Sequence, residues 1–359
     1  MSTSQTLELN KSLALLIYEI KAKIKEGNEI NGFEKELNEI CSESENYACF
    51  KTFDAAKKNL EKNRYGNILS QDDTRFKLNL KEFDSDYINA NWISDNSNDS
   101  LNKSDYIAAQ GPLYKTRDDF WQMIWDSGSK IIVMLTKVIE DGRVKCDIYW
   151  PQNKNLETRD FIVSVTQPEK KEEDITIRKF IIQKKGFSDN REITQLHYQG
   201  WPDQGIPNNI KNFMQVVYKC QEYQEKGPII VHCSAGVGRT GCFIIIHNIL
   251  KTIMKQLKEG KGFSKINVRE RLLHFRKQRC YLINSTEQYE FCFLGIQNGL
   301  EDLLVKMETN EEPKLDPENM IINSVSMMLS KNCDEDNDNE LPNFESGEIN
   351  QKSKKTQNF

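Results

Sequence analysis

The sequence predicts an α/β (α+β) fold, in which a single domain has a central twisted mixed β-sheet flanked by helices. The first observation is a series of short apolar or alternating runs typical of strands, at 87–93, 105–109, 131–136, 144–150, 160–166, 175–182, 192–198 and 228–231. The second is helical periodicity at 117–127, 208–225, 241–258, 264–278 and 284–306. The third is a glycine-rich loop between the last strand and a helix, with the last three helices after it.

Two helices are expected ahead of this pattern. Apolar residues recur at helical spacing over 7–26, namely Leu13, Leu16, Ile17, Ile20 and Ile24. Gly27 and Asn28 would end this helix, and a second is expected over 32–43. We therefore expect residues 1–32 to be an N-terminal helical extension and residues 33–303 to be the main domain.

The remaining segments are polar. Loops are expected at 94–100, 152–158 and 167–174. Residues 309–359 have little to bury and include an acidic run at 334–340, so a disordered acidic tail is expected there. An apolar patch at 320–329 interrupts the tail and would either pack on the domain or bind a partner.

Composition restricts the classes of function. The formal net charge of -5 offers no basic surface for nucleic acid. Nine cysteines, an odd number without C-x2-C pairs, argue against a disulfide framework and against zinc. The apolar runs are too short to span a bilayer. We expect a monomer of the cytoplasm or nucleus, without a metal or cofactor.

One loop carries most of the functional information. Cys233 lies six positions before Arg239, with glycines between them, after an apolar run and before an apolar helix. The loop amides are therefore expected to surround an anion at the helix N-terminus. Such positive surroundings favour a thiolate, and the planar fork of an arginine can hold two phosphoryl oxygens. The pattern predicts a phosphate site with a sulfur nucleophile.

The alternative is that Cys233 is a buried structural thiol in a glycine-rich turn. A single cysteine–arginine spacing is short enough to occur by chance. The flanking strand, the glycines at 236, 238 and 241, and the hydroxyl of Thr240 favour catalysis, because each has a task in phosphate chemistry.

Residues 232–241 (HCSAGVGRTG) resemble the signature loop of the protein tyrosine phosphatases, in the phosphotyrosine-specific, non-receptor branch. Other segments resemble the family in the same order: 62–69 (KNRYGNIL), 86–91 (DYINAN), 106–113 (YIAAQGPL), 119–125 (DFWQMIW), 132–136 (IVMLT), 145–151 (KCDIYWP) and 201–207 (WPDQGIP). The resemblance extends over 33–303, which it identifies as a phosphatase catalytic domain. It implies metal-independent hydrolysis of phosphotyrosine in partner proteins.

The resemblance also implies a role for each matched residue. Cys233 would be the nucleophile, Arg239 the phosphate clamp and Asp203 the general acid on a mobile lid. Thr240 would help the thiolate to depart, and Gln288 would position water. Asp203 alone would otherwise be an ordinary residue of a Pro-Asp turn.

Substrate contacts are implied in the same way. Tyr65 would form the wall of a slot deep enough to select phosphotyrosine, although in isolation it could be a core aromatic. Asn67 would contact the substrate backbone. The phosphate contacts would come from Ser234, Ala235, Gly236, Val237, Gly238, Arg239 and Gln288.

Four residues are expected to support the site. His232 would tune the thiolate, Glu140 would orient Arg239, and Lys145 would face Asp203. Asn284 stands where the family usually has glutamine and is one methylene shorter. The hydrolysis step is therefore expected to be slower, or to depend on Gln288 alone.

Two other functions remain open at this point. A weakly catalytic reader of phosphotyrosine is favoured only by Asn284. A broad phosphatase acting on phosphoserine or phosphoinositide is disfavoured by Tyr65, because a shallow site would lack this wall. Tyr281 is bulky and is expected to obstruct a second phosphate site beside Arg276 and Arg279.

Overall fold

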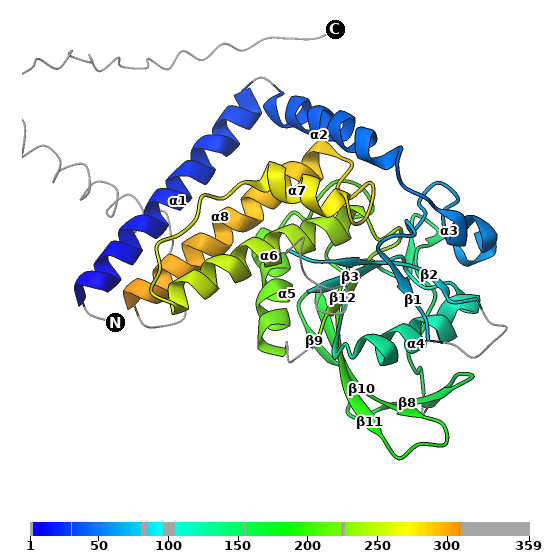
Figure 1. Ribbon diagram of the computed structural model, residues 1–359. Coiled ribbons are helices and arrows are strands. Elements are labelled where there is room, and N and C mark those ends of the chain that lie inside the picture. Colours follow the sequence, from blue (N-terminus) through cyan, green and yellow to red (C-terminus); the bar gives the residue numbers. More distant parts are fainter. Residues whose placement is uncertain are drawn as a thin grey trace, which may run out of the picture. The chain divides into compact units, whose positions relative to one another are not determined.

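The computed structural model describes residues 3–29, 31–79, 85–95, 105–153, 155–223 and 227–309. A ten-stranded sheet has the order β1-β2-β3-β12-β4-β11-β10-β8-β7, with β9 paired to β10 (Figure 1). Its strands are β1 (Arg75–Lys77), β2 (Tyr87–Ile93), β3 (Tyr106–Ala109), β4 (Ile131–Met134), β7 (Asn155–Glu157), β8 (Phe161–Val165), β9 (Lys170–Glu172), β10 (Ile175–Lys184), β11 (Asn190–Tyr198) and β12 (Ile229–His232). A separate hairpin consists of β5 (Ile139–Glu140) and β6 (Arg143–Val144).

The sheet is mixed, and its centre is parallel. Strands β3, β12, β4 and β11 pair in parallel, whereas the outer pairs are antiparallel. The last residues of the parallel strands are in register, because His232 pairs with Ala109 and Met134, and Met134 pairs with His197. The segments that follow these strands therefore start from one edge of the sheet, which is where open α/β sheets bind ligands.

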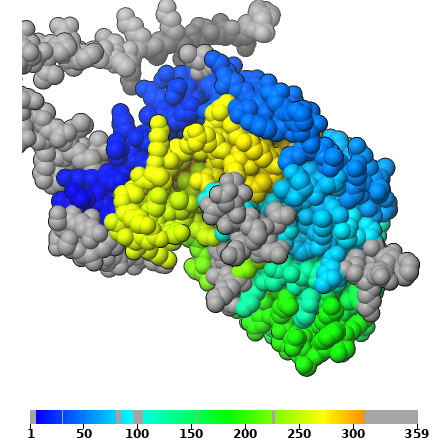
Figure 2. Space-filling model, viewed as in Figure 1, coloured from blue at the N-terminus to red at the C-terminus, as the bar shows by residue number. Residues whose placement is uncertain are grey.

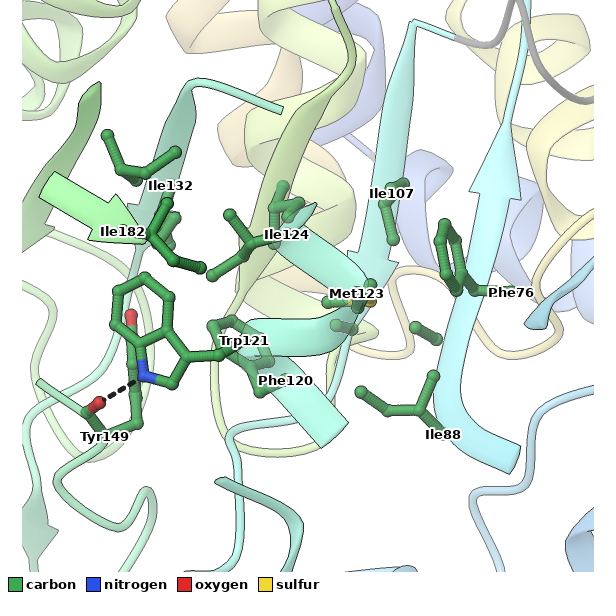
Figure 3. Close-up of a cluster of buried hydrophobic side chains, with 14 of the residues drawn as sticks. Phe76, Ile88, Ile107, Phe120, Trp121, Met123, Ile124, Ile132, Tyr149 and Ile182 are labelled. Atoms are coloured by element: carbon green, nitrogen blue, oxygen red, sulfur yellow. Dashed lines mark hydrogen bonds between the residues drawn. The ribbon is translucent and has the colours of Figure 1, made fainter. Parts of the chain in front are cut away.

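One face of the sheet packs against α4 (Arg117–Ser127). Figure 3 shows Phe120, Trp121 and Ile124 of this helix among Ile107, Ile132 and other sheet residues. The Trp121 indole Nε1 donates a 2.7 Å hydrogen bond to the Tyr149 carbonyl oxygen, which the figure marks with a dashed line. These large buried side chains form the core on the side of the sheet opposite the helical layer.

The helical layer contains α5 (Ile210–Tyr223), α6 (Gly238–Lys258), α7 (Val268–Arg276) and α8 (Thr286–Thr309). Because side chains alternate along a strand, Tyr106 points away from α4 and contacts His247 of α6. The N-terminal helix α1 (Thr3–Glu29) packs along α8. Helix α2 (Gly32–Ala48) lies against α7, and the two can be followed side by side in Figure 2.

The described residues also form three short helices: α3 (Asp54–Lys58), η1 (Leu60–Lys62) and η3 (Tyr114–Thr116). In the described part of the chain, none of the helices has the length and apolar character needed to cross a membrane.

The predicted fold class is confirmed, with local corrections. The strand predicted at 144–150 is wrong, because this segment is irregular after Val144 although Cys146, Tyr149 and Trp150 are buried. The loops predicted at 152–158 and 167–174 contain β7 and β9. Gly27 does not end the first helix, which continues to Glu29. The second helix extends to Ala48, and the expectations for 310–359 lie outside the described residues.

Candidate active site

The nucleophile predicted from the sequence lies directly after the central strand β12. Cys233 is only 5% exposed. Its Sγ accepts a hydrogen bond from the Gly236 amide at 3.3 Å, so the loop curls back over the sulfur. Helix α6 begins at Gly238, which places a helix N-terminus beside the sulfur.

The orientation of the loop follows from its carbonyl groups. Four successive carbonyl oxygens accept bonds from donors outside the loop: Ser234 from the Gly111 amide (2.9 Å), Ala235 and Gly236 from the Arg279 guanidinium (3.1 and 2.8 Å), and Val237 from the Ile283 amide (3.2 Å). Among the described residues, the amides of Ser234, Ala235 and Val237 have no acceptor. Since the carbonyls bind outward, these amides form an anion-binding concavity.

Gly236 is required by space as well as by conformation. Its φ is 73°, and a Cβ there would lie 2.2 Å from the Ala109 carbonyl oxygen. Only glycine allows the loop to approach β3 so closely. The end of β3 therefore forms part of the support beneath the loop.

Arg239 and Glu140 form a bidentate ion pair. The Arg239 Nη1 and Nη2 atoms lie 2.6 and 2.9 Å from the two carboxylate oxygens of Glu140. The Glu140 Oε1 also accepts bonds from the Thr136 hydroxyl and the Lys137 amide, so the carboxylate is itself held. Such paired, planar contacts fix the guanidinium plane.

The same guanidinium reaches the predicted lid. Arg239 Nη2 donates to the Pro202 carbonyl oxygen at 3.1 Å. Its Cζ lies 5.7 Å from the centre of the Trp201 ring. The described residues offer no acceptor to Arg239 Nε, which is therefore the donor left for a phosphate oxygen.

Asp203 lies on the lid beside the β5–β6 hairpin. The Asp203 Oδ2 accepts a 3.0 Å hydrogen bond from the Asp141 amide. The neighbouring Asp141 side chain lowers the pKa of Asp203, and the Asp203 side chain raises that of Asp141. Lys137 and Arg239 favour the charged form of Asp203, and Lys145 favours that of Asp141; that Lys145 faces Asp203 stays a prediction.

His232 is fully buried behind the nucleophile. Its Nδ1 lies 3.2 Å from the Cys233 carbonyl oxygen, and its Nε2 lies 2.9 Å from the Tyr149 hydroxyl. A carbonyl can only accept, so Nδ1 carries the proton and Nε2 accepts from Tyr149. Burial lowers the pKa of His232 to about 3, so the ring is neutral at physiological pH. The Tyr149 hydroxyl accepts in turn from Gln195 Nε2 at 2.7 Å.

Tyr65 stands at the mouth of the loop. Its hydroxyl is 2.8 Å from the Ser234 Oγ, and Ser234 donates to the Lys145 carbonyl oxygen at 2.9 Å. The Arg64 guanidinium anchors the segment by donating to the carbonyls of Gly111 and Pro112. Asn67 is exposed on the same segment.

The remaining predicted residues surround the start of α6. The Thr240 hydroxyl is buried and has no hydrogen-bond partner among the described residues. The Gln288 side chain covers Gly238, where a Cβ would lie 2.6 Å from its Oε1. Asn284 is exposed, and its nearest bond is a 3.4 Å contact from Arg276 Nη2.

Arg279, Tyr149 and Asp141 were not predicted as site residues. Arg279 was placed beside a second phosphate site, but it is only 1% exposed. Its guanidinium donates hydrogen bonds both to the signature loop and to the side-chain oxygens of Asn89 and Asn91. Because Arg279 is far from Cys233 in the sequence, no local pattern indicated this contact. In the part of the chain that the structure describes, no cluster of three or more His, Cys, Asp or Glu has the arrangement of a metal site.

Comparison with known proteins places this geometry in a family. Residues 59–298 match the family described as Protein-tyrosine phosphatase. The receptor-type tyrosine-protein phosphatase zeta of Rattus norvegicus is 40% identical over 265 residues, covering 70% of this chain and 11% of that protein. Tyrosine-protein phosphatase 2 of Dictyostelium discoideum is 38% identical over 227 residues, covering 62% and 57%.

A solved structure shares the fold. The catalytic domain of human protein tyrosine phosphatase non-receptor type 18 superposes with a TM-score of 0.69 and 31% identity, covering 80% of this chain and 99% of that one. The chain spans about a ninth of the receptor-type relative and little more than half of the Dictyostelium protein. With the family match extending over most of the described sheet and the helices that follow the nucleophile, the chain belongs to the protein-tyrosine phosphatase family.

Proposed function

We propose that the protein hydrolyses phosphotyrosine in other proteins through a cysteinyl-phosphate intermediate. The observation that carries the proposal is the buried Cys233 sulfur inside a loop whose four carbonyls are bound outward. A sulfur nucleophile and an anion-binding set of amides thus share one site. Membership of the family supports the same activity.

In the first step, the Cys233 sulfur attacks phosphorus and the bond from phosphorus to the tyrosine oxygen breaks. Arg239 donates its Nε hydrogen to one equatorial oxygen beside the loop amides, and Glu140 holds the guanidinium in plane. Asp203 gives a proton to the departing tyrosine oxygen, which would otherwise leave as a phenoxide. The products are tyrosine and Cys233 phosphate.

In the second step, water attacks phosphorus and the sulfur–phosphorus bond breaks. The water proton passes to the Asp203 carboxylate, and inorganic phosphate leaves. Gln288 lies over Gly238 and would hold this water, whereas Asn284 points to Arg276. The unpartnered Thr240 hydroxyl would donate to the departing thiolate. The position of Asn284 supports the version of our prediction in which Gln288 acts alone.

Selectivity for phosphotyrosine is assigned to Tyr65. Its hydroxyl is fixed to Ser234 at the loop, so its ring extends the site away from the sulfur. A phosphoserine side chain is too short to reach the floor of such a slot. Asn67, exposed on the same segment, would contact the substrate backbone.

We also propose the setting in which the enzyme works. Residues 33–303 would be the catalytic domain, residues 1–32 its helical extension and residues 309–359 an acidic tail. The described cysteines are all free, which suits a reducing cytoplasm or nucleus. We propose a monomer that acts on phosphotyrosine proteins in signalling and not on nucleic acid.

The test is turnover of matched phosphotyrosine and phosphoserine peptides by three proteins: the wild type, Cys233→Ser and Asp203→Ala. We expect phosphate release from phosphotyrosine alone, unaffected by a chelator, with none from Cys233→Ser. Asp203→Ala should still bind the peptide but turn it over at least about a hundredfold more slowly. Full activity of Cys233→Ser, or release from phosphoserine at an equal rate, would refute the assignment.

A further inference from the structure

An arginine of strand β10 donates to two side chains of the neighbouring strand β11. Arg178 Nη1 lies 3.0 Å from Gln195 Oε1 and 3.2 Å from His197 Nδ1. Arg178 pairs with Gln195 across the ladder, and His197 follows two positions later, so all three side chains share one face of the sheet. Because Nη1 carries two hydrogens, it can serve both acceptors. Two chains of hydrogen bonds therefore begin at Arg178.

The first chain ends at the nucleophile. Gln195 Nε2 donates to the Tyr149 hydroxyl at 2.7 Å, and this hydroxyl donates to His232 Nε2 at 2.9 Å. His232 Nδ1 then donates to the Cys233 carbonyl oxygen at 3.2 Å. An arginine can only donate, so Gln195 turns its oxygen to Arg178 and its amide to Tyr149. Every bond of this chain therefore donates toward Cys233.

The second chain ends at the phosphate clamp. His197 accepts from Arg178 at Nδ1, so its proton is on Nε2, which donates to the Thr136 carbonyl oxygen at 2.8 Å. The hydroxyl of the same threonine donates to Glu140 Oε1 at 2.9 Å. This carboxylate oxygen lies 2.6 Å from Arg239 Nη1. One guanidinium is thus connected both to the nucleophile and to the clamp.

Arg178 is itself held in place. Its Nε donates to Glu169 Oε2 at 3.0 Å, and its Cζ lies 4.7 Å from the centre of the Trp150 ring. The side chains of both chains are buried, and buried hydrogen bonds in series strengthen one another. Burial also lowers the pKa of His197 to about 4 and that of His232 to about 3, so both rings are neutral acceptors at physiological pH.

We propose, on the basis of the function above, that Arg178 is a positioning residue for both halves of the catalytic site. Through Gln195 it fixes the backbone at Cys233, and through His197 it fixes the carboxylate that holds Arg239. Arg178 itself touches neither the substrate nor the reacting atoms. Its loss would leave the peptide contacts in place but misplace the sulfur and the clamp in the transition state, where small displacements are costly.

The test is turnover of a phosphotyrosine peptide by Arg178→Met, Gln195→Met, the double variant and the wild type. Methionine keeps an unbranched stem and removes the donor. We expect kcat to fall about tenfold in Arg178→Met and about three- to tenfold in Gln195→Met, with KM changed less than about twofold. Because Arg178 acts partly through Gln195, the double variant should lose less than the product of the two single losses.

Arg191→Met is the matched control. Arg191 also lies over a tryptophan ring, that of Trp125 at 3.9 Å, but it belongs to neither chain. Its replacement removes the same charge and the same kind of ring contact, so kcat should change less than about twofold. An equal loss of kcat in Arg191→Met would show that the effect of Arg178 is one of charge or packing, and would overturn the proposal.

Side-chain ¹⁵N spectra separate positioning from a general loss of structure. The chain has four histidines, so each ring can be assigned by substitution. In Arg178→Met, the His197 Nδ1 resonance should move toward that of a nitrogen without a donor. In Gln195→Met, the His232 Nε2 resonance should move in the same direction as its bond from Tyr149 weakens, while His197 stays unchanged.

Three results would overturn the proposal: unchanged kcat in the single variants, a loss confined to KM, or lower kcat with both ring resonances unmoved. If Arg178→Met does not fold, Gln195→Met decides in the same way through kcat and the His232 resonance. If the wild type itself released no phosphate from phosphotyrosine, the proposed function would fail, whereas the ring resonances would still report the two chains.

Discussion

Three buried histidines should make the fold sensitive to mild acid. Burial lowers the pKa of His197 to about 4, and those of His232 and His247 to about 3, from an ordinary value of 6.5. A base whose pKa is lowered by folding is neutral in the native protein but binds a proton when the chain unfolds. The stability is therefore complete above the unfolded pKa and is lost as the pH falls below about 6.5.

The magnitude follows from the number of protons. Each additional proton bound by the unfolded state lowers the free energy of unfolding by about 1.4 kcal/mol per pH unit. Three such groups give a slope of about 4 kcal/mol per unit below pH 6, and a loss of about 4 kcal/mol between pH 7.5 and 5.5. Domains of this kind have a total stability of about 5–15 kcal/mol, so this loss is a large fraction of it.

The perturbation that isolates one proton is His247→Asn. The His247 Nδ1 lies 2.7 Å from the Tyr106 hydroxyl, and an asparagine amide can replace that contact. The His247 Nε2 is buried without a partner among the described residues, so no second bond is removed. This position lies on α6 and takes no part in the proposed chemistry.

The assay is urea unfolding at pH 7.5, 6.5, 6.0 and 5.5, followed by tryptophan fluorescence. The variant should lose about one third less free energy than the wild type over this range. Buried carboxyls such as Asp119, whose pKa is raised by burial, act in the opposite sense. The comparison of slopes, rather than the absolute slope, is therefore decisive. Equal slopes for the wild type and His247→Asn would refute the reasoning.

Three further substitutions test the site. Gly236→Ala should lower kcat/KM in peptide turnover by at least about a hundredfold, and the free energy of unfolding in urea by about 2 kcal/mol or more. The reason is that the new Cβ would meet the Ala109 carbonyl. Wild-type values in both assays would contradict the close approach. Glu140→Gln should reduce kcat more than it changes KM, because Arg239 loses a charged partner while the shape is kept; a change in KM alone would argue against this orienting role. Arg279→Lys should lower the free energy of unfolding in urea by about 3 kcal/mol, because one ammonium cannot reach all four acceptors of the guanidinium. A loss below about 1 kcal/mol would show that the loop carbonyls do not depend on Arg279.

The sequence predicted the centre of the molecule better than its periphery. Strands β3 and β4 and the first three residues of β12 are apolar because both faces of the sheet are covered there, so these runs are unambiguous. The failed strand at 144–150 shows the limit of this argument. Cys146, Tyr149 and Trp150 are buried by contacts with α4 and the sheet. A buried segment need not form the hydrogen bonds of a strand. The short strands β7 and β9 exist because of their partners rather than their own composition.

In the active site, features local in the sequence could be predicted and contacts between distant residues could not. The signature loop could be read locally, since its nucleophile, glycines and arginine are contiguous. The contacts of Arg279 could not, because hydrogen bonds to backbone carbonyls leave no complementary side chain in the sequence. The bond between Asp141 and Asp203 depends on a turn and a lid that meet only in the folded chain.

The outward-bound carbonyls have a consequence for turnover. A loop fixed by Gly111, Arg279 and Ile283 has its amides in place before any anion arrives, so little ordering is required on binding. These amides meet only the phosphoryl oxygens, which the substrate and the released phosphate ion share. Inorganic phosphate should therefore compete with the substrate for the same loop. Product inhibition is built into this geometry, and only contacts beyond the phosphate, beginning at Tyr65, can favour the substrate over its own product.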